Sequence, residues 1–307
     1  MDVCPEQTET WRLGSMAIDA LDDLCREDEP FFLRVSFHAP HVACYVPREY
    51  YIDPASISLG LPAAGELEGK PLFEQGPLRT YCAADLTPDQ IGVCRGTYFG
   101  MVSLLDTQIG RMLEHLEARD ILDDTLIAFT SDQGFQLGEH GLWKKRVFYE
   151  DNVRVPLILC WPRRIPAGSC VRGIVEHIDF LPTLLECAGL GVPTDIRGKS
   201  LMPLVTGQSG SGREAAFCEI DHSQSMLEEL RGGGRRVMVR TSEWKLVEFM
   251  DSRLSDPDGA LYNLADDPGE RHNLHGMSKY SDIINRLRSL AHDWDPTTAV
   301  GARGPVG

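Results

Sequence analysis

The sequence contains no hydrophobic run long enough to form a membrane span. Such a span needs about 20 consecutive apolar residues, and no stretch of the 307-residue chain comes near that length. Residues 1–7 are polar and show no signal-peptide pattern. We therefore expect a cytoplasmic protein that has no membrane partner.

The sequence is also poor in basic residues. It has 30 Lys and Arg residues against 46 Asp and Glu residues, which gives a formal net charge of −16. Proteins that bind nucleic acids usually carry a basic surplus, so the composition predicts no nucleic-acid partner. It does not exclude an anionic substrate, because a few local cations and a metal ion can dominate the field inside a site.

Cysteines in a Cys-x-x-Cys spacing are absent. The nine cysteines are odd in number and scattered along the chain, so they do not indicate a disulfide framework. Several of them lie within apolar runs, as Cys160 and Cys187 do. We expect most of the cysteines to be small buried hydrophobic residues in a reducing compartment.

The chain does contain enough apolar material for a sizeable core, since 42% of its residues are hydrophobic. Apolar positions recur at helical spacing in four segments, which are residues 9–26, 87–119, 178–189 and 278–292. Thr87 and Pro88 match the N-cap and first-turn positions of the second predicted helix. Asp106, inside this helix, is interpreted as a structural polar contact rather than a metal ligand.

Short apolar runs predict core strands at residues 31–37, 126–130 and 156–161. The second of these is expected to be buried on both faces. Shorter strands then follow one another at residues 215–220, 236–241 and 244–249. Ser242 and Glu243 suit a hairpin turn between the last two. The predicted fold is α/β, a mostly parallel sheet flanked by helices, followed by a small antiparallel sheet with a packed helix.

We divide the chain into an α/β domain over residues 1–212, an antiparallel subdomain over residues 213–300 and a loose tail over residues 301–307. Residues 43–88 are rich in Pro, Gly and Ala and have weak periodicity, so they form a long irregular insertion. We expect this insertion to line the mouth of the functional site.

Polar residues follow the second predicted strand directly. Asp132 and Gln133 place a carboxylate and an amide oxygen at its carboxyl end, which is where open α/β sheets bind ligands. Gly134 allows a sharp turn beside them. Lys144 and Lys145 then bring two ammonium groups to the same loop. Oxygen ligands for a cation, followed by cations of the protein, suit an anionic substrate held between metal and lysine.

A second candidate site follows the strand predicted at residues 31–37. His38 and His41 flank Pro40, so two imidazoles lie at the carboxyl end of this strand. We expect His38 to cap the turn, and we treat His41 as the functional candidate.

One long string resembles the C-terminal metal-and-lysine segment of the sulfatase family, which belongs to the alkaline phosphatase superfamily. It reads Thr-Ser-Asp-Gln-Gly-Phe-Gln-Leu-Gly-Glu-His-Gly-Leu-Trp-Lys-Lys-Arg over residues 130–146 and continues with Tyr149-Glu150 and Arg154-Val155-Pro156. Residues 30–41, 98–113 and 261–274 resemble other segments of the same family. The resemblance covers nearly the whole chain and corresponds to the later part of a complete family member.

The resemblance implies a role for each candidate residue. Asp132 and Gln133 would hold a divalent cation, and Lys145 would contact the sulfate group, with Lys144 as the alternative. His41 would bind the leaving ester oxygen or donate a proton to it. His140 would serve nearby or would only order the loop.

The implied cofactor is a divalent cation. All-oxygen ligation favours Ca²⁺ over zinc, with Mg²⁺ or Mn²⁺ as alternatives. Gln133 departs from the Asn or His that is commoner in the family, which leaves the identity of the metal open. The implied substrate is a small anionic ester, and a homo-oligomer is left open as a partner.

Sulfatases of this kind use a cysteine, oxidised to formylglycine, within a Cys-x-Pro-x-Arg motif that follows paired aspartates. The early region of this chain offers only Asp22-Asp23, on the polar side of a predicted helix. Residues 160–164 match the motif, but Cys160 ends an apolar strand instead of starting a helix, so we interpret the match as a coincidence. We therefore expect the C-terminal portion of a sulfatase-like hydrolase of sulfate esters, truncated before its nucleophile.

Two other hypotheses stay open. Sulfate and phosphate monoesters share a tetrahedral geometry, so the same residues fit a phosphonate monoester or phosphodiester hydrolase on the same scaffold. The third hypothesis is a non-catalytic relative or a gene fragment that folds poorly or only binds anions. The sequence does not indicate the alcohol part of the substrate, because the residues that select it are expected in the insertion at residues 43–88.

Overall fold

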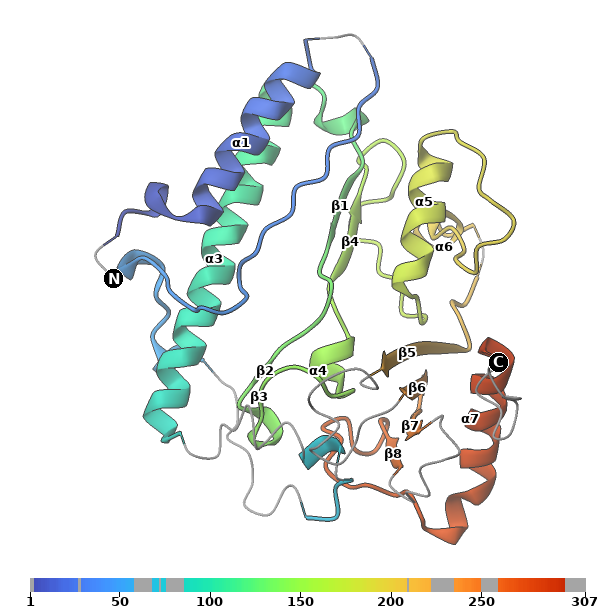
Figure 1. The fold of residues 1–307 in the computed structure, drawn as a ribbon. Coiled ribbons are helices and arrows are strands. Elements are labelled where there is room, and N and C mark those ends of the chain that lie inside the picture. Colours follow the sequence, from blue (N-terminus) through green and yellow to red (C-terminus); the bar gives the residue numbers. More distant parts are fainter. Residues whose placement is uncertain are drawn as a thin grey trace, which may run out of the picture. The chain divides into compact units, whose positions relative to one another are not determined.

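A computed structural model of the chain describes residues 3–26, 29–57, 68–71, 73–75, 86–208, 210–221, 235–249 and 259–295 (Figure 1). The chain divides into two compact units, and each is described by itself. The first unit comprises residues 1–61, 84–127 and 161–163, and the second comprises residues 62–83, 128–160 and 164–307. The domain boundary expected at residue 212 stays a prediction, and the tail at residues 301–307 lies outside the described residues.

Two helices of the first unit, α1 (Glu9–Leu24) and α3 (Pro88–Ala118), lie side by side (Figure 1). Both begin where the sequence predicts, because a threonine caps each of them. Thr8 Oγ1 accepts a hydrogen bond from a first-turn backbone N–H at 3.2 Å, and Thr87 forms a reciprocal capping box with Gln90. Neither these helices nor any other in the described residues combine the length and apolar character needed to cross a membrane.

The strand predicted at residues 31–37 does not form. This segment pairs with no strand among the described residues, and its residues alternate between half-buried and exposed positions. Phe32 is 75% exposed. A strand requires a neighbour whose N–H and C=O groups complete its ladder, and the described part of the chain supplies none here. The prediction of a core strand is therefore wrong.

The described part of the first unit also contains four short 3₁₀ helices, namely η1 (Pro5–Gln7), η2 (Arg48–Tyr50), η3 (Pro54–Ser56) and η4 (Leu122–Asp124). Both η2 and η3 belong to the predicted insertion and pack against α3. Gly96 and Gly100 of α3 permit this close approach, because a Cβ at either position would collide with the backbone carbonyl of Ile52 or Tyr50. Residues 58–67 and 76–85 of the insertion lie outside the described residues.

A two-stranded sheet pairs β1 (Ile127–Thr130) with β4 (Leu157–Cys160). Both strands lie where the sequence predicts them. However, β1 is half-buried along its length, and Ile158 of β4 is 56% exposed. Two strands alone do not bury both of their faces, so the expectation of a strand buried on both faces is wrong for the described residues.

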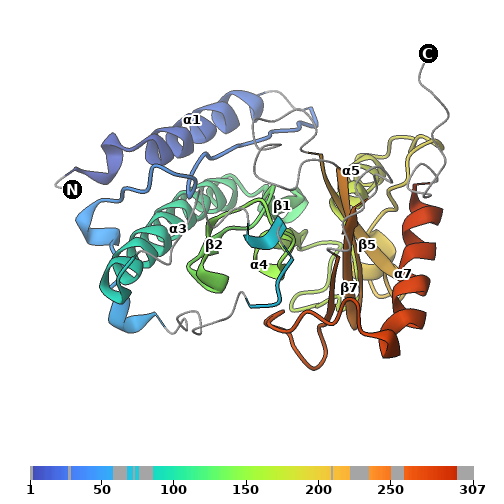
Figure 2. The same ribbon diagram turned by 60° about the horizontal axis from the view of Figure 1, so that its bottom comes forward.

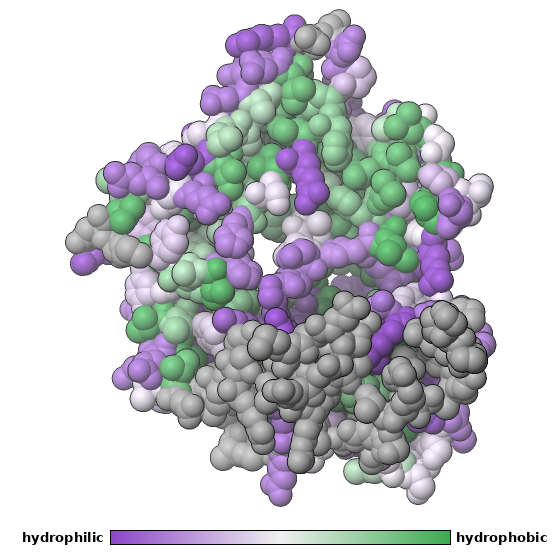
Figure 3. All heavy atoms as spheres, in the orientation of Figure 1, coloured by the Kyte–Doolittle hydropathy of each residue, from purple (hydrophilic) through white to green (hydrophobic). Residues whose placement is uncertain are grey.

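The second unit also contains α4 (Glu150–Val153), η6 (His177–Asp179), α5 (Phe180–Cys187) and α6 (Met202–Val205). The helix predicted near residues 178–189 is confirmed as α5, and Gly189, with φ of 70°, follows its end. Figure 3 shows hydrophobic residues gathered over α5 and the segment after it. The exposed hydrophobic residues of α5 and of that segment include Leu181, Leu190 and Val192.

An antiparallel sheet follows in the order β5 (Ala215–Asp221), β6 (Arg235–Thr241), β7 (Trp244–Phe249) and β8 (Ala260–Asn263). Helix α7 (Ser281–Trp294), preceded by η8 (Ser278–Tyr280), lies along one face of this sheet (Figure 2). Its buried residues Ile284, Leu287 and Ala291 pack against Val237 and Val239 of β6. The predicted small sheet with its packed helix is therefore confirmed.

The opposite face of this sheet is covered by the segment that follows the two candidate lysines. Met238 and Val247 alternate in sequence with residues that contact α7, so they point to the other face. There they belong to a buried cluster with Val147, Phe148 and Tyr149. The sheet thus fixes residues 147–149, and through them the lysine-bearing backbone just before.

Cysteine burial differs from the sequence-based expectation. None of the eight cysteines in the described part of the chain is buried. Cys160 is exposed because it occupies an outward position at the end of β4, and Cys187 is half-buried at the end of α5. The prediction that most cysteines are buried hydrophobic residues is wrong for this part of the chain.

Candidate functional site

The turn after β1 contains Gly134, directly behind the two predicted metal ligands. The Gly134 N–H donates to the carbonyl of Asn152 at 2.7 Å, and the Phe135 N–H donates to the carbonyl of Asp151 at 2.9 Å. A Cβ at position 134 would collide with the Asp151 carbonyl. Glycine is therefore required here by the close approach of two backbone segments.

The two predicted metal ligands differ in exposure. Asp132 is exposed, and its carboxylate makes no hydrogen bond or ion pair with another described residue. Gln133 is half-buried, and its backbone carbonyl accepts a hydrogen bond from Ser131 Oγ at 3.0 Å. One carboxylate and one amide oxygen are donors that suit a hard cation such as Ca²⁺ or Mg²⁺. The donor chemistry therefore fits the expected cofactor.

These two residues do not make a complete metal site by themselves. Within the described ranges, no three His, Cys, Asp or Glu side chains are grouped as metal ligands. Ca²⁺ takes about six to eight oxygen ligands, so water, substrate or further residues would supply the others. The assignment of Asp132 and Gln133 as metal ligands stays a prediction.

The predicted lysines lie on a small hairpin. Strand β2 (Gln136–Leu137) pairs antiparallel with β3 (Trp143–Lys144), and Gln136 lies opposite Lys144. The tip of the hairpin contains η5 (Glu139–Gly141). Because β2 begins two residues after Gly134, this pairing returns the lysine segment to the turn that carries Asp132.

The backbone on either side of Lys145 is left-handed at non-glycine residues. Lys144 has φ of 82° and Arg146 has φ of 89°. Such a conformation costs roughly 1–2 kcal/mol per residue, so surrounding contacts must hold it. Lys145 itself is half-buried and makes no hydrogen bond or ion pair with another described residue. An ammonium group held in this way suits an incoming anion.

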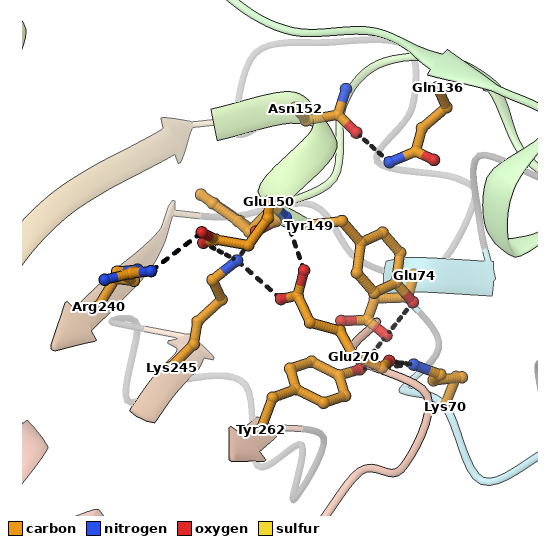
Figure 4. Close-up of polar contacts among 11 residues, drawn as sticks. Lys70, Glu74, Gln136, Tyr149, Glu150, Asn152, Arg240, Lys245, Tyr262 and Glu270 are labelled. Carbon is orange, nitrogen blue, oxygen red and sulfur yellow. Dashed lines mark hydrogen bonds and ion pairs between the residues drawn. The ribbon is translucent and has the colours of Figure 1, made fainter. Parts of the chain in front are cut away.

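A buried ion-pair cluster holds the segment that follows this turn. Lys245 on β7 is 0% exposed and donates to the carbonyl of Phe148 at 2.8 Å. It also pairs with Glu150 at 2.8 Å and with Glu270 at 2.7 Å (Figure 4). Burial raises the pKa of Glu270 to about 7, with Lys245 opposing the shift. Burial acts in the same direction on Glu150, but Lys245 and Arg240 outweigh it and lower the pKa of that carboxyl.

The predicted insertion contributes a second buried cluster. Glu74 Oε2 accepts hydrogen bonds from the hydroxyls of Tyr149 and Tyr262, both at 2.6 Å (Figure 4). Lys70 Nζ donates to the Tyr262 hydroxyl at 3.1 Å. Burial raises the pKa of Glu74, and the charge of Lys70 opposes this shift. Lys70, Phe73 and Glu74 are therefore packed into the second unit, and for them the expectation of lining a site mouth is wrong.

His140 lies in the tip of the hairpin and is buried. Its ring stacks on that of Tyr149, with centroids 3.8 Å apart and an angle of 10° between the planes. Burial, reinforced by the charge of Lys70, lowers the pKa of His140 to about 3, so the ring is neutral near pH 7. Of the two roles implied for His140, a buried neutral ring fits the ordering of the loop.

His41 lies in the first unit, in the turn that follows residues 31–37. Its backbone N–H donates to the carbonyl of His38 at 3.0 Å, and the two rings stack at 4.9 Å. His41 Nδ1 lies 2.7 Å from the carbonyl of Val42, which favours the tautomer with the proton on Nδ1. Nε2 is then the nitrogen available to a substrate, as an acceptor in the neutral ring and as a donor to an ester oxygen once the ring is protonated. The structure describes His41 and the second-unit turns separately, so its catalytic role stays a prediction.

Sequence reasoning missed the buried groups that hold the two turns. These groups are Glu74, Gln136, Asn152, Lys245 and Glu270. Lys245 could have been found from the sequence, because a lysine within the apolar run Trp244-Lys245-Leu246-Val247 needs a charged or polar partner if the strand is buried. The sequence gives no indication that Asn152 is buried, because a polar residue in a short helix is equally compatible with a solvent-exposed position.

Comparison with family models identifies two regions of the chain. Residues 9–190 match the model described as Sulfatase, and residues 138–294 match the model described as N-sulphoglucosamine sulphohydrolase, C-terminal. The first match alone covers more than half of the 307 residues. It includes both candidate turns as well as His41.

Curated relatives and a solved structure agree with these matches. The N-acetylglucosamine-6-O-sulfatase of Bacteroides thetaiotaomicron is 36% identical over 199 residues, which are 64% of this chain and 34% of that protein. An uncharacterized sulfatase of Escherichia coli is 32% identical over 303 residues, which are 94% of this chain and 56% of that protein. The chain thus spans about half the length, or less, of these curated relatives.

The solved structure is the phosphonate monoester hydrolase SpPMH from Silicibacter pomeroyi. It superposes with a TM-score of 0.86 at 27% identity, covering 98% of this chain and 62% of that one. This likeness confirms the α/β, alkaline-phosphatase-like fold class with its small C-terminal antiparallel sheet. The chain belongs to the sulfatase family of the alkaline phosphatase superfamily.

Proposed function

We propose that this chain is the part of a sulfatase that binds a divalent cation and the sulfate group of a small anionic ester, for hydrolysis of that ester. The proposal rests mainly on one observation. The second unit presents an exposed carboxylate, Asp132, and an ammonium group, Lys145, on turns held by buried contacts. Neither group makes a hydrogen bond or ion pair with another described residue. The family matches and the sulfate-ester specificity in the name of the B. thetaiotaomicron relative support the proposal.

Each predicted residue has a role in this proposal. Asp132 and Gln133 hold the cation, which is Ca²⁺ by preference, with Mg²⁺ or Mn²⁺ as alternatives. The bound cation supplies positive charge near the ester oxygens, where negative charge develops during hydrolysis. Lys145 donates charge-assisted hydrogen bonds to sulfate oxygens. With its ring protonated on both nitrogens, His41 donates a hydrogen bond from Nε2–H to the leaving oxygen and can pass that proton to it.

Titration calorimetry of the 307-residue chain tests the two binding roles. We expect Ca²⁺ to bind the wild type and not Asp132→Asn, because the exposed carboxylate provides the charged ligand. With Ca²⁺ present, inorganic sulfate should bind at least about tenfold more weakly to Lys145→Ala, since a charge-assisted hydrogen bond is lost. A wild-type chain that melts cooperatively but binds neither ion would refute the proposal.

A phosphonate monoester hydrolase is the second candidate function. The TM-score of 0.86 with a phosphonate monoester hydrolase favours it, and sulfate and phosphonate groups share a tetrahedral geometry. Comparing turnover of an aryl sulfate with turnover of phenyl phosphonate by a version extended upstream to include the nucleophile region, with Ca²⁺ and with a chelator, separates the two. Faster phosphonate hydrolysis would replace the sulfatase assignment. Cation and sulfate binding without turnover of either ester, in a version extended upstream as well as in this chain, would support the non-catalytic hypothesis.

The location and partners of the protein remain predictions. We propose that the protein is cytoplasmic and binds neither nucleic acids nor membranes. Whether it forms a homo-oligomer is an open question. Sedimentation of the purified chain measures the oligomeric state directly.

A further inference from the structure

Asn152 lies where three segments of the second unit meet. It is 5% exposed and belongs to α4. Its backbone carbonyl accepts the hydrogen bond from the Gly134 N–H at 2.7 Å, which fixes the turn that carries Asp132. Its own N–H donates to the carbonyl of the buried Tyr149 at 2.8 Å. The main chain of Asn152 therefore joins the metal-ligand turn to the segment packed on the antiparallel sheet.

The side chain of Asn152 makes two further contacts. Its Oδ1 accepts a hydrogen bond from Gln136 Nε2 at 2.7 Å, as Figure 4 shows, and Gln136 is 0% exposed. Its Nδ2 donates to the carbonyl of Lys144 at 3.4 Å. A primary amide offers a donor and an acceptor on one short side chain. Aspartate would lose the donor at this position, and leucine would lose both groups.

The contact with the Lys144 carbonyl bears on the direction of Lys145. Lys144 is one of the two left-handed residues that flank Lys145, and its backbone is strained. Strained backbone persists only where its surroundings hold it. Without the hydrogen bond from Asn152, Lys144 is freer to return to an ordinary conformation. That change would reorient the peptide that leads into Lys145.

We propose that Asn152 is a positioning residue that couples the turn bearing Asp132 to the turn bearing Lys145. Its main chain holds the first turn and its side chain holds the second. The carboxylate that binds the cation and the ammonium group that binds the anion therefore keep a fixed position relative to each other. The inference rests on the proposed function, because it takes Asp132 as the cation ligand and Lys145 as the anion ligand. Asn152 itself touches neither ion.

The test compares Asn152→Leu with a matched control, Asn273→Leu, in the full chain. Leucine keeps the approximate shape of asparagine and removes both hydrogen-bonding groups. The side chain of Asn273 also uses both of its polar groups, accepting from the N–H groups of Leu261 and His275 at 3.0 Å each and donating to the Gly259 carbonyl at 3.1 Å. It lies beside β8, away from both turns, so Asn273→Leu shows what losing a comparable amide elsewhere in the unit does to exchange in the turns.

Hydrogen exchange tests, without any ligand, whether the side chain of Asn152 holds the turn that bears Lys145. Asn152→Leu should speed amide exchange at residues 144–146 at least about fivefold, while residues 134–135, whose N–H groups bond to main-chain carbonyls, and β5–β8 stay protected. Asn273→Leu should leave both turns unchanged. Unchanged exchange at residues 144–146 in Asn152→Leu would overturn the inference, whether or not the chain binds ions.

Calorimetry measures the functional half. With saturating Ca²⁺, Asn152→Leu should bind inorganic sulfate about tenfold more weakly than the wild type, because a displaced ammonium group loses aligned hydrogen bonds. In a Lys145→Ala background the same substitution should have no further effect. An equal loss with and without Lys145 would overturn the positioning role. If the wild type binds neither ion, the proposed function fails and the exchange experiment alone decides the inference.

A second variant covers the case in which Asn152→Leu does not fold. The single substitution leaves Gln136 Nε2 buried without its acceptor, which is costly. Combining it with Gln136→Met replaces both partners by apolar groups of similar shape, which is often tolerated. The double variant should show the same faster exchange at residues 144–146. Wild-type exchange in a folded double variant would overturn the inference.

Discussion

His140 is a histidine that the fold keeps uncharged. Burial, reinforced by the charge of Lys70, lowers its pKa to about 3, whereas a histidine in an unfolded chain titrates near pH 6.5. Between about pH 3 and pH 6.5 the unfolded state therefore binds more protons than the folded state. For this group, the free energy of unfolding rises with pH across that window and falls on acidification.

We expect His140→Phe to remove this contribution while keeping an aromatic ring stacked on Tyr149. Between about pH 6 and pH 4, the free energy of unfolding of the wild type should fall more steeply than that of the variant, by at most about 1.4 kcal/mol per pH unit. Urea denaturation at several pH values measures both slopes. His272→Phe is the control, because His272 is exposed. Parallel pH profiles for the wild type and His140→Phe would contradict the prediction.

The lysine turn shows how one element stores strain that a neighbouring element must hold. Arg146 has φ of 89° and lies between Lys145 and the buried anchor at residues 147–149. The anchor packs on the antiparallel sheet, so the chain must enter it in a fixed direction. The left-handed backbone at Arg146 is the local consequence of that fixed entry.

Two substitutions at Arg146 measure this strain. Both Arg146→Gly and Arg146→Ala remove the side chain, but only glycine adopts a positive φ without a steric penalty. We expect the glycine variant to be more stable than the alanine variant by about 1 kcal/mol in urea denaturation, despite the greater flexibility of glycine in the unfolded chain. The same pair at Arg154, which lies outside the positive-φ residues, should show the opposite order. Alanine being equal to or better than glycine at position 146 would mean that the turn is not strained.

Elements with a strong local pattern could be predicted from the sequence. Helices α1 and α3 carry threonine caps and long periodic stripes, and β6 and β7 are apolar runs joined by a short turn. The run at residues 31–37 has the same local character as a strand but no partner among the described residues. Strand formation depends on that partner, so local sequence does not decide it.

The residues of the candidate site also fall into those that the sequence could predict and those that it could not. A carboxylate and an amide directly after a strand, with two lysines close behind, mark Asp132 and Lys145 in the sequence. The groups that hold them are distant along the chain. Glu74 is 75 residues from Tyr149, and Lys245 is 97 residues from Phe148. No local periodicity encodes such contacts, because they exist only once the antiparallel sheet has formed.

At the scale of the whole molecule, the net charge of −16 complicates any measurement of a metal site. An acidic protein attracts divalent cations to its whole surface, and that diffuse attraction is screened by salt. A specific site behaves differently, because an ion that binds only the folded state stabilises it by mass action. The specific contribution must therefore be separated from the general one by substitutions that change the charge equally.

We expect Ca²⁺ at about 100 times its dissociation constant to raise the free energy of unfolding of the wild type by about 2.7 kcal/mol at matched ionic strength. Asp132→Asn should lose this increase, because it removes the charged ligand. Asp123→Asn, which removes the same charge from an exposed position in η4, should keep it. Thermal melts with Ca²⁺ and with a chelator measure all three proteins. If Ca²⁺ raised the free energy of unfolding equally in both variants, the stabilisation would come from the acidic surface. The assignment of Asp132 as a metal ligand would then be wrong.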